Sequence, residues 1–208
     1  MKLHPFSIFG PSIFSGVIQE DILKTPLPFP DQRINQVHGT DVLYVDHYSE
    51  HTATYDAMVS DKSALKLMIK TADCIPLVFA DEQAGVIGAA HAGWRSLVAE
   101  IIPKTIDEMV KLGASRNKIL VGMGPSLGTC CSEFSQPYEE IPEKYHWAIL
   151  ENNHVDLLNI AHQQVMDSGI PGSHVERMAI CTACSPEWFS WRRNHSNERM
   201  GTFIEKIM

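Results

Sequence analysis

Three short segments combine reactive side chains with turn residues, and each follows an apolar stretch. They are Asn35–Gly39, Thr71–Cys74 and His91–Arg95, and they contain His38, Cys74 and His91. Loops at strand ends commonly present functional groups on a rigid scaffold. Two histidines and one cysteine that meet in space supply three ligands for Zn²⁺ and leave a fourth position open. Zinc in such a site lowers the pKa of bound water to about 7.

The same residues leave other interpretations open. Cys74 and His91 could form a nucleophile and its base without a metal. Asp73 directly precedes Cys74 and could orient a ligand histidine, act as a general base or cap a turn. A hydrogen-bonded structural histidine and a buried cysteine are the alternatives without catalysis.

Several other side chains suit the binding of phosphate or of an aromatic substrate. Arg95, Arg192 and Arg193 carry planar guanidinium groups, which bind phosphate in a bidentate manner or form ion pairs. Trp94, with Phe189 and Trp191, could stack on a purine ring or belong to the core. The remaining cysteines form an adjacent pair and a C-x-x-C, and packing is their favoured interpretation because no second C-x-x-C is present: Cys130, Cys131, Cys181, Cys184.

Composition narrows the function classes. The 208 residues include 25 acidic and 17 basic side chains, and the formal charge is −8. An acidic chain without a basic run is a poor candidate for nucleic acid or an anionic membrane. No stretch approaches the roughly 18 apolar residues of a membrane span, and Met1–Phe14 does not resemble a secretory signal. The odd count of five cysteines indicates reduced thiols, so a cytoplasmic location is expected.

Apolar patterning predicts one mixed sheet flanked by helices, hence an α/β (α+β) fold in a single domain over residues 1–208. One helix is expected over Leu97–Leu112, kinked or divided at Pro103, and another over Val155–Asp167. The expected strands are Ile34–Val37, Val42–Val45, Ala57–Ser60, Leu65–Lys70, Ile75–Ala80, Gly85–Ala90, Lys118–Met123 and His174–Ile180.

Six phrases, in order, resemble the YfiH family over roughly Arg33 to Arg199. This family was named multicopper polyphenol oxidoreductase, or laccase-like, and was later linked to purine nucleoside phosphorylase and adenosine deaminase activity. The phrases are QVHGTDV (36–42), DAMVSD (56–61), TADCIPLVFAD (71–81), GAAHAGWRS (88–96), GPSLGTCCSEF (124–134) and CT…FSWRRN (181–194).

The resemblance implies a fold, a metal site and a substrate class. The fold would be a mixed-sheet sandwich similar to the catalytic domain of cytotoxic necrotizing factor. The family's zinc ligands correspond to His38, Cys74 and His91. The implied substrates are phosphate and a purine nucleoside (adenosine, inosine, guanosine or methylthioadenosine), with adenosine deamination as a further activity. We therefore expect Cys74, His91 and Asp73 to be catalytic, and Arg95, Arg192, Arg193 and Trp94 to bind substrate.

The chain departs from the family pattern in its N-terminal FSIFGPSIFSG segment and at Ser126, Ser132 and Trp191. None of these positions is an implied metal ligand. Three alternatives stay open: a metal-free Cys–His hydrolase or amidase, a copper-dependent polyphenol oxidoreductase, and a zinc-stabilised binding module. The chain lacks a His-x-His sequence, so the ligand supply disfavours copper relative to zinc. The sequence does not determine the oligomeric state.

Overall fold

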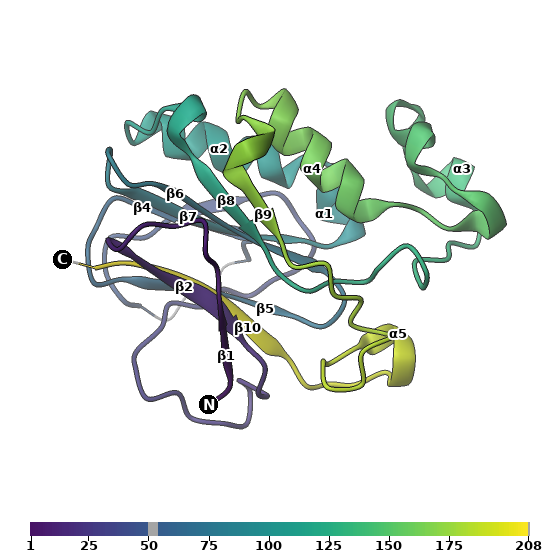
Figure 1. Ribbon diagram of the computed structural model, residues 1–208, viewed down its shortest axis with the longest axis horizontal. Coiled ribbons are helices and arrows are strands. Elements are labelled where there is room, and N and C mark those ends of the chain that lie inside the picture. Colours follow the sequence, from purple (N-terminus) through teal and green to yellow (C-terminus); the bar gives the residue numbers. More distant parts are fainter. Residues whose placement is uncertain (50–53, 208) are drawn as a thin grey trace.

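Two β-sheets pack face to face, and helices cover the outer face of the larger sheet (Figure 1). This architecture comes from a computed structural model that describes residues 1–49 and 54–207. The smaller sheet is antiparallel, with strand order β1-β2-β10-β5. Its strands are β1 (Leu3–Pro5), β2 (Ile13–Ile18), β5 (Lys66–Thr71) and β10 (Met200–Lys206).

The larger sheet is mixed, with strand order β3-β4-β7-β6-β8-β9. β3 pairs with β4, and β8 with β9, in parallel, whereas the inner pairs are antiparallel. The strands are β3 (Val42–Tyr44), β4 (Ala57–Ser60), β6 (Ile75–Asp81), β7 (Val86–Ala92), β8 (Leu120–Met123) and β9 (Val175–Arg177).

Side chains of the central strands are buried on both faces of this sheet. In β6, Leu77 and Phe79 join the core beneath the helices, whereas Val78 and Ala80 face the smaller sheet. Successive side chains of a strand point to opposite faces, so a strand buried on both sides is a continuous apolar run. This explains why the Ile75–Ala80 and Gly85–Ala90 runs were recognisable as strands.

Five α-helices lie within the described residues. They are α1 (Trp94–Val98), α2 (Ile101–Lys111), α3 (Pro137–Glu140), α4 (Leu157–Asp167) and α5 (Trp191–Asn194). Short 3₁₀ turns cover Arg116–Lys118, Glu143–Ala148, Glu151–Asn153 and Gly172–His174. None of the helices in the described part of the chain has the length and apolar character that crossing a membrane requires.

The mixed α/β class is confirmed, but several details differ from the sequence prediction. The predicted single sheet is wrong, because β10 pairs with β2 and β5 to form a second one. The predicted strand Ile34–Val37 makes only an isolated bridge at Asn35. The Gln36 side chain replaces a regular ladder there, since its amide hydrogen-bonds both backbone groups of Lys70 at 2.8 and 2.9 Å.

The predicted helix over Leu97–Leu112 is two helices. The break falls at Glu100, whose φ of 67° is left-handed, rather than at Pro103. Pro103 lies in the first turn of α2, where a backbone N–H has no helical partner and proline is tolerated. The predicted strand His174–Ile180 is shortened to Val175–Arg177. Whether the fold resembles the cytotoxic necrotizing factor domain, and whether residues 1–208 form one domain, stay predictions.

Candidate metal centre

Sheet register brings the first residues of the site together. β4 and β7 are antiparallel with Ala57 opposite Ala90, so Asp56 lies beside His91, whose N–H donates to the Asp56 carbonyl at 2.7 Å. β6 and β7 pair Ile75 with Ala92, so Cys74 lies at the same end of the sheet. Three interior strands therefore place Asp56, Cys74 and His91 at one end of the sheet, although 35 positions separate Asp56 from His91.

Asp56 holds the loop that carries His38. This carboxylate is fully buried and accepts from the backbone N–H groups of Val37 (3.2 Å), His38 (3.0 Å) and Gly39 (2.6 Å). It also accepts from Nδ1 of His91 at 2.7 Å. Burial opposes its ionisation, but these donors keep the pKa of Asp56 below its usual value. One carboxylate therefore orients both histidines.

The backbone near the ligands is unusually constrained. His38 and Asp73 adopt positive φ values of 61° and 87°, a conformation that costs energy in residues other than glycine and recurs at functional sites. Gly93 lies against the ligands. A Cβ at this position would stand 2.1 Å from Nδ1 of His38 and 3.2 Å from Sγ of Cys74. Only glycine permits this approach.

The three expected ligands converge. Each of His38, Cys74 and His91 offers a ligand atom, and these atoms lie within 4.8 Å of one another. The two imidazole rings are 4.7 Å apart. Two nitrogen donors and one sulfur donor match the ligand chemistry of zinc and leave a coordination position open. Because Asp56 engages Nδ1 of His91, Nε2 is the nitrogen left for an ion, as in other carboxylate–histidine–metal arrangements.

Electrostatics distinguish the two histidines. Burial and the neighbouring His91 lower the pKa of His38, so this ring is neutral and able to bind metal. Burial alone would lower the pKa of His91 too, but its hydrogen bonds to Asp56 and Cys74 raise it to about 9. The chain therefore holds a proton on His91 at neutral pH, and an ion must displace it.

The donors open into a cavity of about 810 Å³ whose lining comes from both sheets. Three cationic residues contribute to this lining. Lys70 is the penultimate residue of β5, Arg199 lies just before β10, and Arg95 is the second residue of α1. Burial, together with the charges of Arg33 and Arg199, lowers the pKa of Lys70. Within residues 1–49 and 54–207, no ion pair to a carboxylate involves Lys70, Arg95 or Arg199. The rim is therefore positively charged.

The other expected site residues divide between the cavity and the loops around it. Asp73 lines the cavity, and its carboxylate accepts from Oγ1 of Thr182 (2.7 Å) and the N–H of Arg192 (2.6 Å). Trp94 lines it as well, with the Arg95 guanidinium 4.2 Å from its ring centroid.

The two adjacent arginines differ in their surroundings. The Arg192 side chain lines the cavity and donates to the Glu133 carbonyl. The Arg193 guanidinium donates to backbone carbonyls of the 182–188 turn, and Arg193 is not among the lining residues described. The catalytic and substrate-binding roles of these residues stay predictions.

Sequence reasoning assigned no role to Asp56, Lys70, Gly93 or Arg199. Asp56 stands directly before a buried strand, within one of the phrases shared with the YfiH family. This position is the feature of the sequence from which a role for Asp56 could have been predicted. Lys70 lies in β5, and Arg199 directly precedes β10. They lie near each other because β5 and β10 pair, although these strands are distant in the sequence.

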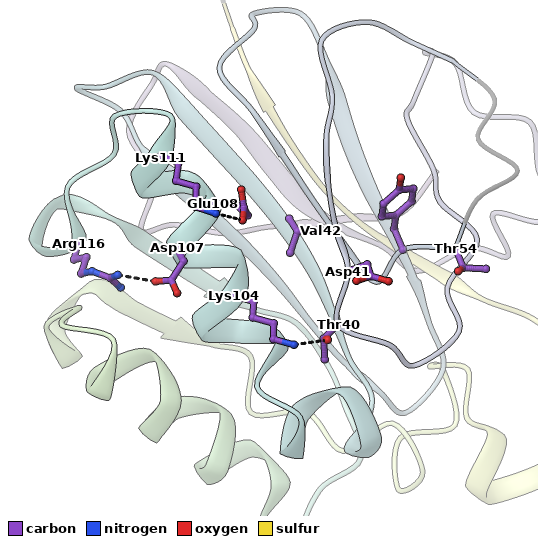
Figure 2. A pocket seen from close by; sticks show the side chains of 10 residues that line it. Thr40, Asp41, Val42, Thr54, Lys104, Asp107, Glu108, Lys111 and Arg116 are labelled. Atoms are coloured by element: carbon purple, nitrogen blue, oxygen red, sulfur yellow. Dashed lines mark hydrogen bonds and ion pairs between the residues drawn. The ribbon is translucent and has the colours of Figure 1, made fainter.

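A second depression, of about 920 Å³, is lined by residues of α2 and of the segment before β3 (Figure 2). Its charges are matched within the depression. Lys111 pairs with Glu108 and Arg116 with Asp107, both at 2.6 Å, while Lys104 donates to Thr40 at 2.6 Å. This mutual pairing leaves little net field for a charged ligand, in contrast to the positive rim around Cys74.

The fold and the donor set define a two-sheet α/β protein with a candidate metal centre at one end of the larger sheet's central strands. Residues 20–208 match the family described as multi-copper polyphenol oxidoreductase laccase, and the chain belongs to this family. The resemblance found in the sequence phrases is thereby confirmed.

Relatives of this chain carry two kinds of enzyme name. Purine nucleoside phosphorylase ORF3 of Streptomyces griseus is 32% identical over 179 residues, which are 82% of this chain and 72% of the relative. Purine nucleoside phosphorylase of Deinococcus radiodurans is 35% identical over 172 residues, 78% and 64% of the two chains. Adenosine deaminase RL5, from an unknown prokaryotic organism, is 29% identical over 161 residues, 73% and 62%. The chain thus spans less than two thirds of the last two relatives.

Solved structures share the fold. YlmD of Geobacillus stearothermophilus superposes with a TM-score of 0.84 at 22% identity, over 98% of this chain and 94% of that one. The hypothetical protein YfiH of Bacillus licheniformis gives a TM-score of 0.75 at 27% identity, over 89% and 77%.

Proposed function

We propose that this protein is a zinc-dependent purine nucleoside phosphorylase that also deaminates adenosine. The observation that carries the proposal is the convergence of His38, Cys74 and His91 beside a cavity with a positive rim. The names of the relatives support both activities. The substrates would be phosphate and adenosine, inosine, guanosine or methylthioadenosine.

His38, Cys74 and His91 would hold the ion. Zinc supplies a Lewis acid that polarises an oxygen and lowers the pKa of water. The chain's own contribution is orientation. Asp56 keeps the His91 proton on Nδ1 and so leaves Nε2 free for the ion, and its bonds to three backbone N–H groups fix the loop of His38.

Phosphorolysis requires an anion placed against the anomeric carbon of the sugar. A phosphate oxygen forms the new bond there while the bond to the purine nitrogen breaks. This yields the free base and ribose 1-phosphate, or 5-methylthioribose 1-phosphate from methylthioadenosine. Lys70, Arg95 and Arg199 offer the positive charge that holds this anion. Trp191, 48% exposed and also in the lining, offers a face for the purine ring.

The direct test supplies the zinc-loaded protein with each nucleoside, with and without phosphate. We expect phosphate-dependent formation of ribose 1-phosphate and base, and formation of inosine and ammonia from adenosine, measured by chromatography with mass detection. Absence of both ribose 1-phosphate and inosine from a protein shown to contain zinc would overturn the proposal.

Lys70→Met separates the phosphate step from the rest. Loss of a charged contact to phosphate is worth about 1.5–3 kcal/mol, so we expect the KM for phosphate to rise by roughly 10- to 100-fold. The KM for the nucleoside and the deamination rate should change little. Lys62→Met is the matched control, because Lys62 is exposed and pairs with Asp61 away from the cavity lining. Equal phosphate KM values in the two variants would remove Lys70 from the phosphate site.

One observation favours a second candidate, a metal-free Cys–His hydrolase or amidase. Cys74, His91 and Asp56 form a chain of hydrogen-bonded groups in which the carboxylate orients the imidazole beside the thiol. Such an order of groups activates a thiol nucleophile. Amide hydrolysis that survives exhaustive chelation would favour this candidate. In a separate labelling experiment, alkylation of Cys74 by iodoacetamide despite added zinc would favour it as well. A bound thiolate that is protected until zinc is removed supports the metal centre.

A further inference from the structure

Four of the five cysteines form a second cluster of sulfur donors. Cys130, Cys131, Cys181 and Cys184 have Sγ atoms that all lie within 4.8 Å of one another. Sγ of Cys184 is 3.4 Å from Sγ of Cys130 and 3.4 Å from Sγ of Cys131. Packing, the favoured interpretation from sequence, does not suit Cys130 and Cys184, because both are exposed.

The spacing fits a shared ion. Four sulfurs bound tetrahedrally to zinc at about 2.3 Å are roughly 3.8 Å apart. This value lies between the two separations of 3.4 Å and the 4.8 Å within which all four sulfurs lie. A disulfide would bring Cys184 to about 2.05 Å from one partner only. Its sulfur is instead equidistant from two cysteines, which suits a centre that uses both.

The local backbone supports the Cys181 end of the cluster. The N–H of Gly128 donates to Sγ of Cys181 at 3.2 Å, and donors of this kind support thiolate ligands from outside the coordination shell. A Cβ at Gly128 would stand 2.9 Å from Cβ of Cys181, so the close approach of these two segments needs glycine. The N–H of Ser185 closes the C-x-x-C turn on the Cys181 carbonyl at 3.0 Å.

The cluster joins two segments with little regular structure. One runs from the end of β8 to α3 and the other from the end of β9 to α5. Backbone contact between them centres on Ser126. Its carbonyl accepts from the N–H of Thr182 at 3.0 Å, and its N–H donates to the carbonyl of Ile180 at 3.3 Å. Exposed sulfurs contribute little hydrophobic burial, so an ion is the stronger means of holding these segments together.

Charge at the cluster is also accommodated. Four thiolates around a divalent cation carry a net charge of about −2. The Arg193 guanidinium lies at the C-x-x-C turn, where it donates to the carbonyls of Thr182 (2.7 Å), Ser185 (3.0 Å) and Ala183 (3.3 Å). A cation fixed at this turn offsets part of that negative charge.

We propose that Cys130, Cys131, Cys181 and Cys184 form a closed structural zinc site, distinct from the His38–Cys74–His91 centre. The ion would clamp two segments that build one wall of the cavity, since Leu127 lies on the first segment, and Trp191 and Arg192 directly follow the second. Thr182 of the clamped turn bonds Asp73, so the clamp also supports the residue next to Cys74. The proposal requires no particular reaction at the neighbouring centre.

Metal content tests the proposal without any activity measurement. We expect the intact protein, loaded with zinc and freed of excess metal, to hold two equivalents by elemental analysis. Cys184→Ser and Cys74→Ala should each hold about one. The control Thr129→Ser, an exposed neighbour in the first segment, should hold two. One equivalent in the intact protein that persists in Cys184→Ser and vanishes in Cys74→Ala would overturn the proposal.

Cobalt substitution gives an independent measurement on the unaltered chain. Thiolate-to-cobalt charge-transfer absorption grows with the number of sulfur ligands, which is four at the cluster and one at Cys74. Most of the absorption should therefore remain in Cys74→Ala. If Cys184→Ser does not fold, the spectrum of the intact protein still shows whether cobalt binds several thiolates or one. Absorption from one thiolate only, or a native mass lowered by the hydrogens that disulfide formation removes, would contradict a four-cysteine metal site.

Discussion

Asp56 is the side chain on which the orientation of both histidines depends. In Asp56→Asn the amide cannot accept all four hydrogen bonds and carries no charge to support His91. Loss of such a partner typically costs 10–100-fold in metal affinity. We expect a weakening of this size at the His38–Cys74–His91 centre, measured by zinc competition against a chelator.

The matched control for this change is Asp61→Asn, because Asp61 bonds Tyr44 and Lys62 rather than either histidine. Its zinc affinity should equal that of the unaltered protein. An Asp56→Asn protein that also keeps full affinity would show that the carboxylate does not support the ligands.

The proton on His91 makes the metal-free protein sensitive to pH. Hydrogen bonds to Asp56 and Cys74 outweigh burial and raise the pKa of His91 to about 9, whereas an unfolded chain has a value near 6.5. The folded state therefore binds this proton more tightly. Its contribution to the free energy of unfolding is complete below about pH 6.5 and is lost as the pH rises through about 9.

Urea unfolding of the chelated protein at pH values below, within and above that window measures the effect. We expect the free energy of unfolding to fall across the window in the unaltered chain and to change much less in His91→Gln. Equal slopes for the two proteins would assign the pH dependence to other groups.

At the level of single residues, the sequence was sufficient to single out three candidate metal donors, with the help of the resemblance to the YfiH family, but not the residue that supports them. His38, Cys74 and His91 are recognisable because their side chains bind metals and each follows an apolar run. Nothing in the residue type of Asp56 indicates its role, which depends on the pairing of β4 with β7 that places it beside His91. The four-cysteine cluster was missed because two separate loops supply its members.

The turn between β7 and α1 is the structural element that leaves room for the side chains of the candidate metal donors. Gly93→Ala places a Cβ 2.1 Å from Nδ1 of His38, so the His38 ring must move. We expect a large loss of zinc affinity with little change in melting temperature of the metal-free protein. Isothermal titration and thermal denaturation measure the two effects.

Gly172→Ala provides the comparison for this change, because its added Cβ would meet only Sδ of Met166, at 3.8 Å. Metal affinity should be unaffected. Normal zinc binding by Gly93→Ala would mean that His38 is not held where the structure has it.

Strands and helices were predictable where the burial of one or both faces gives the sequence a clear apolar pattern. β6 and β7 are apolar on both faces, and α4 follows the capping residue Asp156. β10 was missed because Gly201, Thr202 and two charged residues interrupt its apolar pattern, and because its partner β2 lies near the other end of the sequence. The position of Lys70 in the cavity lining could not be predicted without that smaller sheet.

The whole molecule rests on a core shared by the two sheets. Leu67 and Ile204 of the smaller sheet pack in one cluster with Val78 and Ile87 of the larger sheet. We propose on this basis that residues 1–208 form one domain and expect unfolding in one cooperative transition. Tryptophan fluorescence and far-ultraviolet circular dichroism should give coincident urea curves, since Trp188 belongs to the same cluster.

Phe203→Ala should destabilise the whole molecule by about 3–5 kcal/mol, because Phe203 in β10 is completely buried. Tyr138→Ala is the control, since its side chain is 65% exposed and such changes usually stay within about 0.5 kcal/mol. Two separated transitions, or a Phe203→Ala effect limited to one spectroscopic probe, would indicate that the sheets unfold independently.

The pairing of β4 with β7 has a consequence for how the protein would handle its ion. Asp56 and His91 are held together by paired strands of the core, so this part of the candidate metal centre is formed before an ion binds. On the zinc proposal, a molecule that loses the ion from the His38–Cys74–His91 centre keeps this Asp56–His91 arrangement and can bind an ion again. The share of working molecules would then follow the supply of the metal rather than the synthesis of new chains.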